Sequence, residues 1–220
     1  MTTRTAARNR GRVRPILNVL TLVGALLIVT LAYHLRSTAG SAASTATPES
    51  NSRFALEPDD AASIAAFKEA YKVLMHPRCM NCHPSGDAPL QGEDSHIHAQ
   101  NVKRGPDGKG KYALKCANCH QDANLPGENM PPGNPNWHLP SPEMPLVFQG
   151  QTAGELARQL KDPRQNGGKT LEQLLHHVSD DKLVLGCWDP GDGRTKPPLA
   201  HEEFVLKMRE WIEKGAACPP

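Results

Sequence analysis

The sequence predicts a mainly α-helical protein with long irregular loops, preceded by an N-terminal transmembrane helix. Three observations lead to this prediction. Four segments after residue 58 repeat apolar side chains at the spacing of an amphipathic helix. The segment 84–150 is rich in Gly, Pro, Asn and His and lacks the alternation of a β-strand. An uncharged, mostly apolar run covers residues 16–33.

The N-terminal segment has the layout of a membrane anchor. Five arginines precede the apolar run, and no acidic residue occurs before Glu49. As a helix the run spans about 27 Å, close to the roughly 30 Å of a bilayer core. A cleaved secretory signal, whose apolar part is typically shorter, is the alternative. Positive flanks stay in the cytoplasm. We therefore predict a cytoplasmic tail over 1–15, a single anchor over 16–35 in the bacterial cytoplasmic membrane, and a periplasmic C-terminal domain.

Composition separates this anchor from the folded domain. Residues 36–58 are rich in Ser, Thr, Ala and Pro, which is typical of a flexible tether, so we expect the domain to cover 59–220. Six of the 25 basic residues lie in the first 36 positions, which leaves 19 basic against all 23 acidic residues in the rest. Without a basic cluster, the domain is not predicted to bind nucleic acid.

Each of the four helices has a local signal. The capping-box pairs Thr152/Glu155 and Thr170/Gln173 predict helices over 153–162 and from 171 onward. The other two are predicted over 58–75 and 201–214. Each has an apolar face, made of Ile64, Phe67, Tyr71 and Met75 in the first and of Phe204, Met208, Trp211 and Ile212 in the second.

The pattern C-x-x-C-H occurs twice, at 79–83 and 116–120, and we call these segments the first and second cysteine motifs. It is the attachment pattern for c-type haem, in which two thiols bond to the porphyrin edge and the next His ligates the iron. We therefore predict two covalently bound c-type haems, which would also fill a domain poor in aromatic residues. The attachment residues are Cys79 and Cys82 for one haem and Cys116 and Cys119 for the other, with His83 and His120 as proximal iron ligands.

Other interpretations of the cysteines explain less of the pattern. A zinc ribbon uses two C-x-x-C pairs but does not explain the His after each pair. A redox-active C-x-x-C is expected in a βαβ context that this sequence lacks, and a disulfide inside either motif would close a very small loop. Cys187 and Cys218 remain, and in an oxidising compartment we predict a disulfide between them, with two free buried thiols as the alternative.

The group opposite each proximal histidine decides the chemistry, because a filled site favours electron transfer and an open one admits small molecules. We consider His98, Met144 and His138 as distal candidates. His98 lies midway between the motifs in a polar loop, and Met144 lies in a Met-Pro pair before a capped helix, similar to the distal-methionine segment of small c-type cytochromes. His177 is expected to pack or to face solvent instead.

Several blocks of the sequence resemble a family of exported di-haem cytochromes that are often named as subunits of isoquinoline 1-oxidoreductase. The blocks include "HPRCMNCHPSGD", "CANCHQDAN", "NWHLP", "CWDPGDGR" and "WIEKGAACP", and the likeness covers about residues 66–219. It implies a di-haem cytochrome c-type domain and a redox partner of the molybdenum hydroxylase class.

The expected function is that of a membrane-anchored periplasmic electron carrier. It would pass electrons, received from such a dehydrogenase, to the respiratory chain, as a subunit more than as a catalyst on its own. The alternative is a di-haem peroxidase or small-molecule reductase with an open distal site.

Overall fold

The structure, a computed structural model, describes residues 58–220. In chain order the longer elements are α1 (Asp60–Leu74), α3 (Ala153–Lys161), α4 (Leu171–Asp180) and α6 (His201–Glu213). The short elements are α2 (Pro77–Met80), β1 (Leu90–Gln91), β2 (His96–Ile97), β3 (Gly110–Lys111), β4 (Leu114–Lys115), η1 (Cys116–Asn118), α5 (Lys182–Leu185) and η2 (Gly186–Trp188). Over these residues the fold is partly helical with few strands, as predicted.

All four predicted helices are present, and two of them, α3 and α4, begin at the predicted caps. At the start of α3 the Glu155 N–H donates to Thr152 Oγ1 at 3.2 Å, and the Thr152 N–H donates to Glu155 Oε2 at 2.8 Å. The same reciprocal pair opens α4 through Thr170 and Gln173. These caps satisfy backbone donors within the first turn, so they act locally and are readable from sequence.

The buried face of α1 differs from the prediction. Ile64 and Tyr71 are only half-buried, whereas Ser63 is fully buried. The Ser63 hydroxyl donates to the Trp211 carbonyl at 2.8 Å and accepts from the Ala217 N–H at 2.9 Å. These two long-range bonds turn the small-residue side of α1 towards α6.

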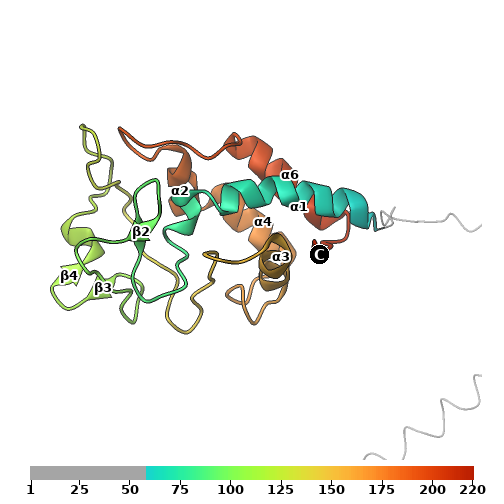
Figure 1. Cartoon of the computed structure of the whole chain (residues 1–220), viewed down its shortest axis with the longest axis horizontal. Helices are drawn as coiled ribbons and strands as arrows, with labels where there is room; N and C mark the ends of the chain where they lie inside the picture. The colour runs from blue at the N-terminus through green and yellow to red at the C-terminus, as the bar shows by residue number, and fades with distance from the viewer. Residues whose placement is uncertain (1–57) are drawn as a thin grey trace, which may run out of the picture. The chain divides into compact units, whose positions relative to one another are not determined.

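The main core lies between the helices, which gather together in Figure 1. Phe67 of α1 and Trp211 of α6 are both fully buried, with ring centroids 4.8 Å apart. Leu156 of α3 and Leu174 of α4 belong to the same cluster. Burial of each such side chain stabilises the fold by about 1.5–3 kcal/mol, so this cluster is the main apolar support of the domain.

Most of residues 84–150, which we call the loop-rich region, lies at the end of the domain that carries β2, β3 and β4 in Figure 1, whereas Leu146 and Phe148 near its end pack against the helical core. Two minimal antiparallel hairpins occur here: Leu90 pairs with Ile97, and Gly110 pairs with Lys115. The buried Arg104 donates to the Pro140 carbonyl at 2.6 Å and to Gly86 at 3.1 Å. Polar bonds of this kind hold the region together.

One close approach in this region requires a glycine. Gly108 has a φ of +72°, and a Cβ there would overlap the Leu139 carbonyl. The Leu139 N–H also donates to the Gly108 carbonyl at 2.9 Å. The contact joins the segment before the second cysteine motif to the segment that carries Trp137 and His138.

Within residues 58–220 no helix combines the length and the apolar character needed to cross a membrane. The predicted tail over 1–15 and anchor over 16–35, and the tether up to residue 57, lie outside the described residues.

Candidate functional site

A cavity of about 860 Å³ brings the two cysteine motifs together. Its volume is at the upper end of the range of about 300–1,000 Å³ for small-molecule and cofactor sites. All six motif cysteines and histidines line it, namely Cys79, Cys82, His83, Cys116, Cys119 and His120. Motifs that are 37 residues apart in sequence therefore share one space.

The first cysteine motif continues from a short capped helix. The α2 helix begins at Pro77, where the His76 Nδ1 accepts a bond from the Arg78 N–H at 3.3 Å. Turn-type bonds then extend past the end of α2, because the Cys82 N–H donates to the Cys79 carbonyl at 3.2 Å. This winding brings both thiols and the following His83 to the cavity wall.

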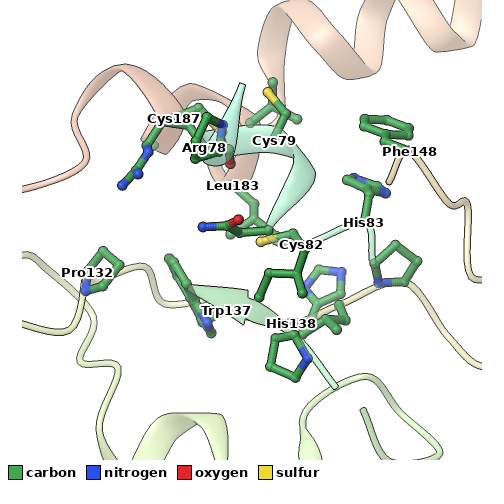
Figure 2. Close-up of a pocket in the computed structure, with 18 of the residues that line it drawn as sticks. Arg78, Cys79, Cys82, His83, Pro132, Trp137, His138, Phe148, Leu183 and Cys187 are labelled. Atoms are coloured by element: carbon green, nitrogen blue, oxygen red, sulfur yellow. The ribbon is translucent and has the colours of Figure 1, made fainter. Parts of the chain in front are cut away.

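The imidazole of His83 is held on two sides. Its Nδ1 lies 2.7 Å from the Leu146 carbonyl oxygen. Its ring stacks on that of Phe148, which lies beside it in Figure 2. The two centroids are 3.9 Å apart and the ring planes are 10° apart. Since a carbonyl only accepts, Nδ1 carries the proton, and Nε2 keeps its lone pair for a metal.

The second cysteine motif repeats this arrangement on a different support. Its cysteines lie on η1 and the turn that follows, where the His120 N–H donates to the Cys116 carbonyl at 2.9 Å. The His120 Nδ1 lies 2.7 Å from the Pro132 carbonyl oxygen. Its ring stacks on Trp137, with centroids 4.2 Å apart and planes 11° apart. Both histidines therefore have the same tautomer and an aromatic neighbour.

Burial keeps both of these histidines neutral near pH 7. It lowers the pKa of His83 to about 4, although the hydrogen bond to the Leu146 carbonyl raises this pKa in part. Burial also lowers the pKa of His120. A neutral imidazole is the form that ligates metals.

Burial raises the pKa of two motif thiols, those of Cys82 and Cys116. The pKa of Cys82 is about 12, mainly because of burial and to a smaller extent because of the charges of Cys187 and Cys116. Cys116 belongs to the second motif, so thiols of both motifs influence one another across the shared cavity.

The predicted disulfide between Cys187 and Cys218 is not present, because all six cysteines are free thiols. Cys187 lines the cavity, donates to the Arg78 carbonyl at 3.2 Å and lies beside Cys79 (Figure 2). Cys218 instead packs against the core cluster of the helices. Cys187 therefore lies at the cavity and Cys218 at the helical core, and no covalent bond joins the loop around Cys187 to the C-terminus.

The three distal candidates, His98, Met144 and His138, all line the cavity. His138 lies near the first motif in Figure 2, although its own segment follows the second motif. The charges of His138 and His177 both lower the pKa of His83, and the charge of His98 lowers that of His120.

Sequence reasoning missed His177, which lines the same cavity from α4. Its Nδ1 lies 3.4 Å from the Asp181 carboxylate one turn later. A carboxylate on the second ring nitrogen is a frequent feature of metal-binding histidines. The His177/Asp181 spacing of four residues was the available signal.

The donor set fits a c-type haem at each motif, because two thiols and an oriented neutral imidazole face one cavity. A shared zinc site fits less well. Among residues 58–220, no group of three or more His, Cys, Asp or Glu side chains is arranged to hold a metal ion.

Comparisons of the chain with protein families, curated proteins and solved structures find no match.

Proposed function

We propose that this protein is a di-haem c-type cytochrome that carries electrons. The observation that carries the proposal is the shared cavity: both C-x-x-C-H motifs line it, and each proximal histidine is fixed by a carbonyl at 2.7 Å. A c-type haem supplies an iron that changes oxidation state by one electron. Two such groups in one cavity would make a short electron path.

The residues of the chain have three roles in this proposal. Cys79 and Cys82, and in the second motif Cys116 and Cys119, attach the two cofactors covalently. His83 and His120 ligate iron, and the Leu146 and Pro132 carbonyls orient them. Apolar cavity residues, among them Leu74, Phe148 and Met208, exclude water and thereby influence the reduction potential.

The location and the partner are proposed on the sequence alone. The basic tail and the apolar run 16–33 support a membrane-anchored periplasmic protein. The resemblance to di-haem cytochromes supports a molybdenum hydroxylase-type dehydrogenase as the electron donor and the respiratory chain as the acceptor.

Haem attachment is the direct test. The full chain is produced with and without the bacterial haem-attachment machinery, and denatured protein is measured by haem staining and intact mass. Wild type should carry two haems that resist denaturation. The variants Cys79→Ala/Cys82→Ala and Cys116→Ala/Cys119→Ala should each carry one, and Cys218→Ala, outside the motifs, should carry two. Wild type without covalent haem would falsify the proposal.

Carbon monoxide binding separates the electron carrier from the peroxidase or reductase alternative. An electron carrier with both axial positions filled should leave its ferrous spectrum unchanged under CO. A wild-type protein that binds CO and turns over peroxide with a reducing substrate would support the enzyme instead.

A further inference from the structure

We propose that His98 is the second axial ligand of the iron at the second cysteine motif, on the side opposite His120. This inference rests on the proposed function. It assigns one distal candidate to one of the two sites, so that the second site has two imidazole ligands.

The ring separation is the first observation. The centroids of His98 and His120 are 6.5 Å apart, and the ring planes are 56° apart. A metal–imidazole bond is about 2 Å, and a ring centre lies about 1 Å behind the ligating nitrogen, so two imidazoles on one metal have centroids about 6 Å apart. The two rings are therefore already separated by the span that one iron requires.

The second observation is an unpaired polar atom. The Nδ1 of His98 is buried and has no hydrogen-bond partner. In three other histidines of the cavity, His83, His120 and His138, Nδ1 instead forms a hydrogen bond with a backbone carbonyl oxygen. A buried ring nitrogen without a partner costs free energy, and this cost is offset when the imidazole ligates a metal.

The backbone around His98 is fixed on both sides. His98 follows strand β2, and its N–H donates to the Pro89 carbonyl at 3.0 Å. Its own carbonyl accepts from the Asn101 N–H at 3.1 Å. These bonds hold the backbone of His98 beside the β1–β2 hairpin, and its side chain lines the cavity.

The chain offers a matched control two residues away. His96 lies on the same hairpin and lines the same cavity. Its Nδ1 is paired with Asp94 Oδ1 at 2.6 Å, and its side chain is 50% exposed. Loss of His96 therefore changes the same hairpin without removing the proposed ligand.

The test uses the ferric full-length protein loaded with haem. His98→Ala should convert one of the two haems from low to high spin in visible and EPR spectra, and after reduction to the ferrous form its CO binding should rise by one per chain. Added imidazole should restore the low-spin spectrum. His96→Ala should retain the wild-type spectrum. In the Cys79→Ala/Cys82→Ala background, His98→Ala should convert all the remaining haem, whereas in the Cys116→Ala/Cys119→Ala background it should change nothing.

The outcomes separate the two proposals. If wild type carries no covalent haem, the proposed function fails. If His98→Ala carries two haems with a wild-type spectrum, the function stands and the His98 assignment is wrong. Should His98→Ala not accumulate, His98→Met is measured instead: a retained low-spin iron with a methionine-type spectrum and a raised reduction potential is expected. An unchanged spectrum and potential in that variant would overturn the assignment.

Discussion

The two cysteine motifs present nearly identical chemistry on unlike supports. Each proximal imidazole has a carbonyl oxygen on Nδ1 at 2.7 Å and an aromatic ring stacked on its face. The first motif begins within the capped helix α2, and its Cys79 packs against the helical core. The second follows a two-residue hairpin in the loop-rich region and has no side-chain cap.

This difference indicates how each site is kept in place. The first motif is supported by burial of apolar side chains, a force that is independent of fine geometry. The second is supported by the close backbone contact at Gly108, within a region held by directional bonds such as those of Arg104, whose acceptor Gly86 lies just after the first motif. Three substitutions or conditions test this contrast.

Removal of the central core side chain should have the largest effect. Trp211→Ala should lower the free energy of unfolding by about 3–5 kcal/mol, because it leaves a cavity between α1 and α6. Trp211 is fully buried against Phe67. Urea unfolding followed by circular dichroism measures the change.

The control for this substitution lies on the same helix. Leu206 is 60% exposed, so Leu206→Ala should change stability by less than about 0.5 kcal/mol. If both variants lost the same free energy of unfolding, the packing of buried side chains would not be what supports the first motif.

Acid should weaken the haem-free chain through His83. Its pKa is about 4 in the folded chain and near 6.5 when unfolded, so between these values the unfolded state binds the extra proton. Stability is therefore complete above pH 6.5 and falls on acidification towards pH 4, by up to about 3 kcal/mol from this group. Urea unfolding of the haem-free chain at a series of pH values measures this slope.

Two variants assign the pH dependence. His83→Gln should reduce the slope over this window, since Gln does not titrate, and leave the part contributed by His120, whose pKa burial also lowers. His176, whose side chain is 76% exposed, serves as the control, and His176→Gln should leave the slope nearly as it is. A slope in His83→Gln as steep as that of the wild type would contradict the assignment to His83.

The smallest effect is expected in the loop-rich region. Arg104→Ala removes the partner of the Pro140 and Gly86 carbonyls, which should cost about 1–3 kcal/mol. Hydrogen exchange should rise first in residues 84–150 and leave α1 and α6 protected. The exposed Arg164 is the control, and a uniform rise of exchange across all helices in Arg104→Ala would argue against two separate kinds of support.

The helices were predictable because their signals are local. The caps at Thr152 and Thr170 act within one turn, and the apolar residues of α6 follow the helical period. The buried face of α1 was not predictable, because Ser63 is turned inwards by bonds to Trp211 and Ala217. The hairpins of two residues per strand are too short to show alternation.

The site was predictable only in part, for the same reason. The order Cys-x-x-Cys-His predicts the two cysteines and the histidine of each motif as site residues within five positions, and all of them line the cavity. The partner of His83 is the Leu146 carbonyl, 63 residues later, and any residue type supplies a carbonyl. The neighbour of Cys187 was also wrongly predicted, since composition suggests pairing with Cys218 but the fold places Cys187 beside Cys79.

The spacing of these carbonyl partners has a consequence for the newly made chain. Pro132, which orients His120, follows it by 12 residues, whereas Leu146 follows His83 by 63. In a chain synthesised from its N-terminus, the first motif therefore appears early. The residue that orients its histidine, Leu146, appears only after the whole second motif. The second motif, with His98 and Trp137 already nearby in sequence, has its immediate neighbours first. The contacts of the second histidine are thus complete before those of the first, which is the reverse of the order of the motifs along the chain.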